Sequence, residues 1–245
     1  MPNGSGMMAD RLYRWLKTHL NRSEVLLLLA LFVPTALVLC FGSLADEMLE
    51  GDTMRFDKGI LLALRSPTDT ADPIGPRWVE TMFTDITSLG STTVLAFITL
   101  AAVVYLLLAR KRGSAWLVLA AVSGGTLIST VLKNLFDRPR PDFVAHIVET
   151  TTASFPSGHA MLSAVTYLTL GVLLARVESS YRLRLFIMGL ALLCTVAVGF
   201  SRVYLGVHYP TDVLAGWALG AAWAMLCWVV ALWLQRRGSL KGDRK

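Results

Sequence analysis

Residues 115–132 read AWLVLAAVSGGTLISTVL, and the next residue is Lys133. The run has no charged side chain and no proline, and about 17–25 consecutive apolar residues are enough for a helix to cross a lipid bilayer. Five further uncharged runs have a similar length. They lie at Val25–Leu44, Thr92–Ala109, Ala160–Ala175, Leu185–Phe200 and Val213–Leu234. We therefore expect an all-α, polytopic integral membrane protein with six transmembrane helices.

The composition agrees with this class of protein. Hydrophobic residues make up 54% of the chain, charged residues only 16%, and the mean hydropathy is +0.56. Such a composition is too apolar for an ordinary soluble domain of 245 residues. The three cysteines, Cys40, Cys194 and Cys227, fall within apolar runs, so they form neither a disulfide framework nor a zinc-binding pattern.

Lysine and arginine collect in alternate connections between the runs, and short basic connections stay in the cytoplasm. The first run is longer than the apolar part of a signal peptide, so we interpret it as the first span. With six spans, the basic segments all lie on one side. They are Arg11–Arg22, Arg110–Arg112, Arg176–Arg184 and Arg236–Lys245. We expect both termini in the cytoplasm and the protein in the inner (plasma) membrane, and we assign the net charge of +6 to topology instead of nucleic-acid binding.

We divide the chain into a basic cytoplasmic or interfacial segment (residues 1–23), a six-helix transmembrane domain (24–235) and a basic cytoplasmic tail (236–245). Outside the membrane, residues 46–90 are long enough to form structure of their own. Apolar residues recur at helical spacing in Phe56–Leu64 and Trp78–Ile86, on either side of a turn region at Pro67–Pro76. They predict two short interfacial helices, which either pack on the membrane surface or form a lid.

Three polar stretches interrupt the apolar pattern at the ends of spans that face outward. They are Lys133-Asn-Leu-Phe-Asp-Arg-Pro-Arg140-Pro141, Pro156-Ser157-Gly158-His159, and Ser201-Arg202 followed by His208 and Asp212. Cations on this face run against the charge rule. A single lysine such as Lys133 could simply extend to the interface, but several cations beside two histidines favour an anion site. Phosphoryl groups need preplaced cations and N–H donors of this kind.

The residues beside these cations have a structural and a chemical interpretation. Ser157 directly precedes a predicted span, so it is either a helix N-cap or, with the Gly158 amide, a donor to phosphate. Pro210 is expected as the first residue of the last span, which places Asp212 in its first turn. Asp212 could act there only on the helix dipole, or it could fix the tautomer of a nucleophilic His208.

Taken together, Lys133-x6-Arg140-Pro141, Pro156-Ser-Gly-His159 and Ser201-Arg202-x5-His208-x3-Asp212 resemble the three-part signature of the type 2 phosphatidic acid phosphatase superfamily. The resemblance covers Lys133–Asp212, about a third of the chain. It implies the six-span membrane branch of that superfamily. The expected activity is hydrolysis of a lipid phosphate monoester or diphosphate at the outer (periplasmic) face, through a phosphohistidine intermediate.

The resemblance also implies the roles of single residues. His208 would attack phosphorus while Asp212 orients it, and His159 would protonate the leaving oxygen and then activate water. The residues expected to bind the phosphoryl oxygens are Lys133, Arg140, Ser157, Gly158 and Arg202. The family needs no metal or other cofactor, and His19 and His146 match no position of the signature.

The residues of the signature recognise only the phosphate, so they do not identify the lipid that carries it. Undecaprenyl diphosphate, converted to undecaprenyl phosphate, is the first choice, and the alternatives are phosphatidylglycerophosphate, phosphatidic acid and lipid A phosphates. Vanadate-dependent haloperoxidases share the signature but are soluble proteins. The six expected spans argue against that class. A transporter would need charged residues along its spans. The expected partners are a lipid phosphate and membrane lipids, without nucleic acid; no protein partner is predicted.

Overall fold

The structure is a computed structural model that describes residues 22–148 and 152–236. All the regular elements of that part of the chain are helices. They are α2 (Arg22–Glu50), α3 (Met54–Ala63), α4 (Arg77–Ser88), α5 (Thr92–Leu108), α6 (Arg112–Phe136), α7 (Gly158–Val177), α8 (Tyr181–Tyr204) and α9 (Pro210–Arg236). The expected all-α class is confirmed. Residues 1–21 and 237–245, which include His19 and most of both basic terminal segments, lie outside the described residues.

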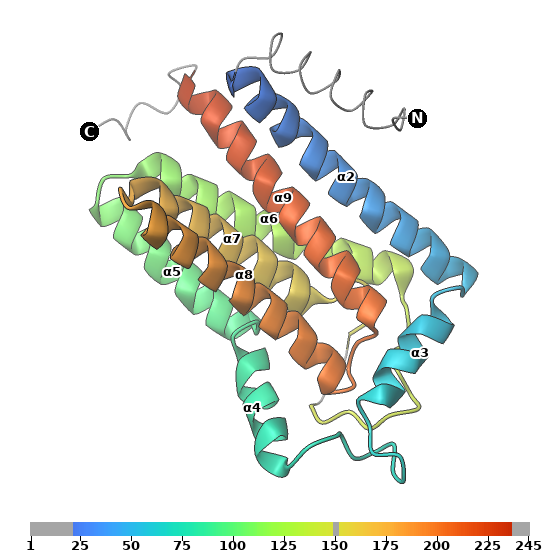
Figure 1. The fold of residues 1–245 in the computed structure, drawn as a ribbon. Helices are drawn as coiled ribbons and strands as arrows, with labels where there is room; N and C mark the ends of the chain where they lie inside the picture. The colour runs from blue at the N-terminus through green and yellow to red at the C-terminus, as the bar shows by residue number, and fades with distance from the viewer. Residues whose placement is uncertain (1–21, 149–151, 237–245) are drawn as a thin grey trace, which may run out of the picture.

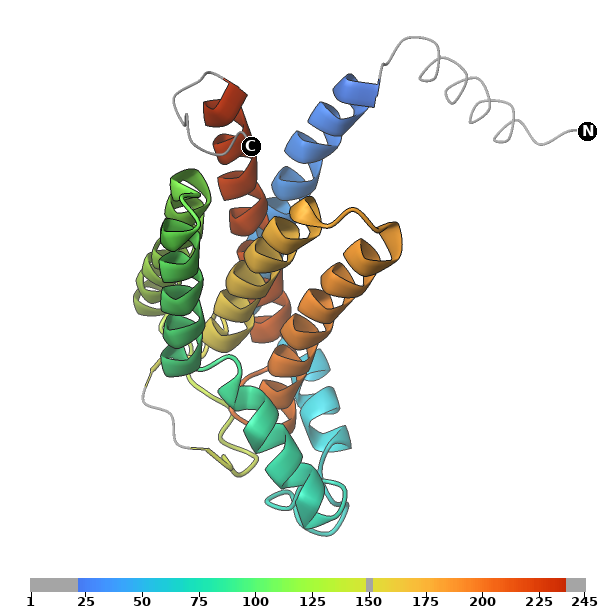
Figure 2. The same ribbon diagram turned by 90° about the vertical axis from the view of Figure 1, so that its left-hand side faces the viewer.

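Six of the helices form a bundle, and α3 and α4 lie at one end of it (Figure 1). Helix α7 lies inside, in contact with α6, α8 and α9, and α2 packs on α9. The view in Figure 2 separates α8 from α5 and shows α7 between them. The turns between α5 and α6 and between α7 and α8 lie at the end opposite to α3 and α4.

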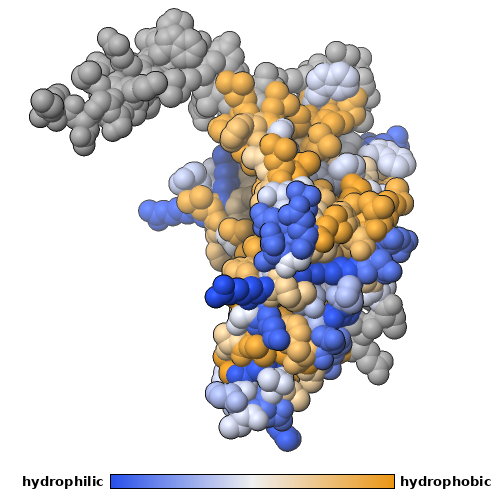
Figure 3. Space-filling view, turned by 90° about the vertical axis from the view of Figure 1, so that its right-hand side faces the viewer, coloured by the Kyte–Doolittle hydropathy of each residue, from blue (hydrophilic) through white to orange (hydrophobic). Residues whose placement is uncertain are grey.

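Five helices, α2 from Leu28 onward and α6–α9, are long and apolar enough to cross a membrane. Helix α5 has 17 residues and becomes a sixth span when it is joined to α4, from which it is bent by 45°. The predicted six-span protein is thus confirmed. Large apolar side chains cover the outside of the bundle; Phe97 and Leu108, for example, are 73% and 80% exposed. On the side drawn in Figure 3, hydrophobic residues predominate above and hydrophilic residues become more frequent toward α3 and α4.

The structure corrects two boundaries of the sequence interpretation. Lys133 was expected in a connection, but it lies in the last turn of α6, which continues to Phe136. Ser201 and Arg202 were also expected in a connection, but they lie in the last turns of α8. Charge marks where a span leaves the apolar layer, whereas the backbone hydrogen bonds of the helix continue for another turn. Pro210 does begin α9, as predicted.

Two glycines of α9 allow the close approach of α7. A Cβ atom at Gly216 would lie 2.7 Å from the Ser157 carbonyl oxygen, and one at Gly220 would lie 2.5 Å from the Met161 carbonyl oxygen. The two glycines therefore serve helix packing. Because α7 and α9 begin at the same end of the bundle, their packing brings two of the polar stretches together. The Ser157 amide donates to the Asp212 carbonyl oxygen at 3.0 Å.

The two predicted helices of the outer segment are also present, as α3 and α4. Helix α3 is more than a surface element, because Leu61 is fully buried against Val203, Tyr209 and Val213. Its Asp57 is fully buried as well. The segment that follows is anchored by Arg65, whose Nη1 donates to the Tyr204 carbonyl oxygen at 2.9 Å. This part of the outer segment is therefore packed into the domain.

Candidate active site

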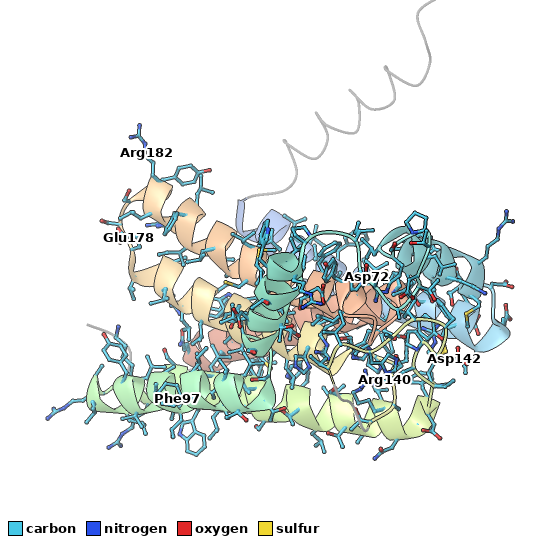
Figure 4. The ribbon with its side chains drawn as sticks, turned by 90° about the horizontal axis from the view of Figure 1, so that it is seen from below. Asp72, Phe97, Arg140, Asp142, Glu178 and Arg182 are labelled. Carbon is cyan, nitrogen blue, oxygen red and sulfur yellow. The ribbon has the colours of Figure 1, made fainter. Side chains whose placement is uncertain are left out.

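All three polar stretches meet at one cavity of about 420 Å³ at the end of the bundle that carries α4. Its lining includes Gly158 and the cations and imidazoles singled out above, namely Lys133, Arg140, His159, Arg202 and His208. Figure 4 looks onto this end and labels Arg140, which lies far from Glu178 and Arg182 at the α7–α8 turn. The structure thus brings together residues that are up to 75 positions apart in the sequence.

His208 lies in the turn before α9 and is buried against Asp212. Its Nδ1 is 3.3 Å from Asp212 Oδ2, and Arg140 Nη1 lies 3.3 Å from the opposite nitrogen, Nε2. A guanidinium can only donate, so Nε2 is the acceptor and the ring proton is on Nδ1, where it donates to the carboxylate. The lone pair of Nε2 therefore points to the cation that lines the cavity, which is the orientation that a nucleophile requires.

Burial is the main cause that lowers the pKa of His208 well below 6.5, and the cations Arg202, Arg140 and Lys133 lower it further. The imidazole is consequently neutral at neutral pH. Burial also lowers the pKa of Arg140, while the charge of Asp212 opposes this effect. The site therefore combines a neutral imidazole with a concentration of positive charge.

Asp212 has other hydrogen-bond partners besides His208. Its Oδ2 accepts hydrogen bonds from the Tyr209 amide at 2.9 Å and the Ser154 hydroxyl at 2.5 Å. Its Oδ1 pairs with Arg138 Nη1 at 2.5 Å. The amide contact is the first-turn role that was one alternative for Asp212, and the histidine contact is the other. Both contacts are present in the structure.

Sequence reasoning assigned no site role to Arg138, Asp57 or Ser154. Arg138 stood among the cations of the first stretch, but the family signature includes Arg140 and not Arg138, so no role was expected for Arg138. In the structure Arg138 is not among the residues that line the cavity. Its side chain is 6% exposed, and its guanidinium lies 4.0 Å from the Tyr209 ring centroid. No sequence motif indicated a role for Asp57, because its partner Arg138 lies 81 residues later in the chain.

Asp57 connects α3 to the start of α9. Its Oδ2 pairs with Arg138 Nη2 at 2.9 Å and accepts from the Thr211 hydroxyl at 2.6 Å. Its Oδ1 accepts from the Thr211 amide at 3.0 Å. A continuous series of hydrogen bonds thus runs from Asp57 through Arg138 and Asp212 to His208. Every side chain in the series is at least nine-tenths buried.

The cations that line the cavity are held by oxygen atoms of the protein. Arg140 donates to the carbonyl oxygens of Thr152 and Val207 at 2.9 and 2.6 Å. Lys133 donates to the carbonyl oxygen of Ala153. Arg202 Nη1 donates to the hydroxyl of Thr87, at the end of α4, at 2.9 Å. These contacts fix the directions of the three cations before an anion arrives, which is electrostatic preorganisation.

Two buried polar atoms at the site lack a hydrogen-bond partner, Ser157 Oγ and Arg202 Nε. Ser157 occupies the N-cap position of α7, but its side chain makes no capping hydrogen bond. The capping alternative for Ser157 is therefore not supported. An unpaired buried polar group is costly, and a phosphoryl oxygen would satisfy either atom.

The other predicted features of the site are less central. His146 Nε2 contacts the Pro141 carbonyl oxygen at 2.6 Å, a contact within the loop between α6 and α7. Among the described residues, no group of three or more histidine, cysteine or acidic side chains could hold a metal ion.

The model of the PAP2 superfamily matches residues 114–236 of this chain. The chain belongs to the PAP2 superfamily. Phosphatidylglycerophosphatase B of Bacillus subtilis is 33% identical over 196 residues, which cover 78% of this chain and 90% of that protein. The undecaprenyl-diphosphatase of Sulfolobus acidocaldarius is 42% identical over 71 residues, 29% of this chain and 30% of that protein.

A solved structure agrees with these PAP2 sequences. The crystal structure of the transmembrane PAP2 type phosphatidylglycerolphosphate phosphatase from Bacillus subtilis has a TM-score of 0.74 and 30% identity. It covers 84% of this chain and 99% of that one. The chain is thus a multi-pass membrane protein of the PAP2 lipid phosphatase family.

Proposed function

We propose that the protein hydrolyses a phosphate monoester or diphosphate of a membrane lipid through a phosphohistidine at His208. The observation that carries the proposal is the orientation of His208. Its Nδ1 faces Asp212, and its Nε2 faces Arg140, which lines the cavity. A neutral imidazole whose Nε2 lone pair faces the cavity can attack phosphorus once the phosphate replaces His208 as the partner of Arg140, and the cations neutralise the charge on the phosphoryl oxygens.

The reaction has two steps. In the first, His208 Nε2 forms a bond to phosphorus, the bond from phosphorus to the lipid oxygen breaks, and His159 gives that oxygen a proton. Asp212 stabilises the positive charge that remains on the phosphorylated imidazole. In the second, His159 takes a proton from water, the water oxygen attacks phosphorus, and the bond to Nε2 breaks to release inorganic phosphate.

The phosphoryl oxygens are bound by Lys133, Arg140, Ser157, Gly158 and Arg202. Lys133, Arg140, Gly158 and Arg202 line the cavity, and the unpaired Ser157 Oγ and Arg202 Nε offer further donors. Gly158 begins α7, where free backbone amides favour an anion. A Cβ atom at Gly158 would lie 3.4 Å from Lys133 Cε, an ordinary van der Waals distance, so Gly158 lies next to that cation.

The site faces the outside of the inner membrane, and both termini lie in the cytoplasm. The basic α5–α6 turn, with Arg110 and Lys111, and the α7–α8 turn lie at the end of the bundle opposite to the cavity. Basic turns stay in the cytoplasm, so the cavity belongs to the periplasmic side. Residues 24–235 thereby form one membrane domain with the site at its outer end.

The first choice of substrate is undecaprenyl diphosphate, and the principal alternative is phosphatidylglycerophosphate. A diphosphatase and a phosphatidylglycerophosphatase are both among the relatives reported above. Phosphatidic acid and lipid A phosphates complete the class. The site's cations and imidazoles recognise the terminal phosphate that all of these lipids share.

The test is phosphate release by the purified protein in detergent from each of these four lipids, with His208→Ala as the blank. Release that His208→Ala abolishes, with thermal unfolding unchanged, supports the proposal. A second assay uses lipid labelled in its terminal phosphate. The label should appear on acid-labile histidine in the wild type and accumulate in His159→Ala. Retention of most activity by folded His208→Ala would remove the nucleophile assignment.

A further inference from the structure

A second cavity, of about 340 Å³, lies between α6 and α9, toward the end of the bundle opposite to the active site. The residues that line it are glycine, alanine, valine, leucine, cysteine and tryptophan, so the lining is apolar. Leu117 and Ala231 are buried, whereas Trp116 and Leu226 are largely exposed. The cavity is therefore a groove with a buried floor that opens to the outside of the bundle. We refer to it as the α6–α9 groove.

The α6–α9 groove runs lengthwise along both helices. On α6 its lining residues recur at helical spacing from Gly113 to Ala120, and on α9 the same spacing continues from Trp223 to Leu234. Residues at this spacing lie on one face of a helix. Trp223 and Leu234 are 11 positions apart, which is about 16 Å along a helix. The groove is thus about as long as one leaflet, which is half of a hydrocarbon core of about 30 Å.

Trp223 closes the inner end of the groove. A Cβ atom at Gly124 would lie 2.4 Å from Trp223 Cζ2, and Trp223 Nε1 donates to the Ala121 carbonyl oxygen at 2.8 Å. The two helices are in contact at this level, so the groove does not continue across the membrane. A flexible chain that enters from one leaflet fits such a groove. A spanning helix of a second copy would instead extend past the closed end.

The open end of the groove is basic. Arg110, Lys111 and Arg112 directly precede Gly113, and the two arginines are exposed. Residues 105–120 and 223–236, which include both sides of the groove, contain no acidic side chain. Basic residues at the membrane surface attract anionic headgroups. The same cations set the topology, but topology alone does not require an apolar groove that begins beside them.

We propose that the α6–α9 groove binds one acyl chain of an anionic phospholipid, with the headgroup beside Arg110–Arg112. The lipid comes from the leaflet at the end of the bundle opposite to the active site. An unfilled groove would leave its lining without van der Waals partners, and an acyl chain supplies them along its whole length. The bound lipid is not a substrate, and the inference does not depend on the proposed function.

The test uses phosphatidylserine that carries a photoreactive diazirine in one acyl chain. The full-length protein is reconstituted with this probe in phosphatidylcholine vesicles and irradiated, and the crosslinked peptides are mapped by mass spectrometry. Crosslinks should concentrate in residues 113–120 and 223–234. Unlabelled phosphatidylserine should compete better than phosphatidylcholine of the same acyl chains. Arg112→Gln should reduce this preference about fivefold, the effect of one basic residue at the membrane surface.

Ala120→Phe fills the groove from α6, at an exposed position. The crosslinks to α6 and α9 should be lost in this variant. The matched control is Ala101→Phe, the same substitution at an exposed position of α5 outside the groove, which should leave them unchanged. Val230→Phe fills the groove from α9 and decides the question if Ala120→Phe fails to fold. Hydrolysis of a water-soluble phosphate ester should continue in all three variants.

The site is overturned if the crosslinks spread evenly over the exposed faces of all the spans, or if Ala101→Phe removes them as fully as Ala120→Phe does. Equal competition by the two unlabelled lipids overturns the preference for an anionic headgroup. Native mass spectrometry provides a further check. A dimer that Ala120→Phe converts to a monomer would show that a second copy, instead of a lipid, occupies the groove.

Discussion

Arg138 Nη1 lies 2.5 Å from Asp212 Oδ1, with both side chains buried. The opposite side of the same guanidinium pairs with Asp57, so Arg138 bridges a carboxylate of the outer segment and a carboxylate of the site. Buried charges of this kind are stable only when each is paired and hydrogen-bonded. The orientation of His208 thus depends on residues that lie outside the cavity.

Arg138→Lys should reveal this dependence. Lysine keeps the charge but has no planar fork, so it cannot hold both carboxylates in the present geometry. We expect kcat to fall about tenfold, with a smaller change in KM, because Arg138 does not touch the substrate phosphate. The measurement is steady-state phosphate release, with Arg182→Lys at the exposed α7–α8 end as the control. A rise in KM alone would instead place Arg138 in substrate binding.

Asp57→Asn tests the role of α3. Asparagine has the same shape and can still accept from Thr211, but it leaves Arg138 with one carboxylate. We expect lower thermal stability and about a 3–10-fold lower kcat. If Asp57 positions the site, the substitution should lower kcat equally for a lipid substrate and for a water-soluble phosphate ester. A loss of activity confined to the lipid substrate would instead indicate that α3 acts as a lid. Asp52→Asn, an exposed acid just before α3, is the control.

The sequence predicted the parts of the molecule that follow from local chemistry. Long uncharged runs predict spans because a bilayer tolerates few charges, and Lys133, His159 and His208 stood out because they violate that pattern. The role of Asp57 could not be predicted from the sequence, since it arises only when α3 packs on α9. The burial of Arg138 was hidden for a similar reason: Arg138 and Arg140 are chemically alike, but Arg138 pairs with Asp57 and Asp212 whereas Arg140 lines the cavity.

The acid side of the pH profile should report His208. Attack requires the neutral imidazole, so kcat/KM falls as pH falls through the pKa of His208. Burial and three nearby cations lower that pKa, which places the acid limb below pH 6.5. Arg140→Gln removes the cation beside Nε2, so the pKa should rise and the acid limb should move to higher pH. An acid limb that stays in place or moves lower would contradict this assignment. Arg184→Gln, at the end of the bundle opposite to the cavity, should leave the acid limb unmoved.

Gly220→Val should separate α7 from α9. A Cβ atom at Gly220 meets the Met161 carbonyl oxygen at 2.5 Å and Ala164 Cβ at 2.9 Å. Neither is the flexible end of a side chain, so the helices must move apart. The cost of such overpacking is about 1–3 kcal/mol.

Separation of the helices also weakens activity, because α7 carries His159 and α9 carries Asp212. We expect a lower unfolding temperature in detergent together with a loss of kcat. Gly189→Val provides the control, since a Cβ atom at that position of α8 has nothing within 4 Å. If Gly189→Val were as destabilising as Gly220→Val, the loss would come from helix propensity and side-chain entropy, which both substitutions share, and the close α7–α9 contact would not be what assembles the site.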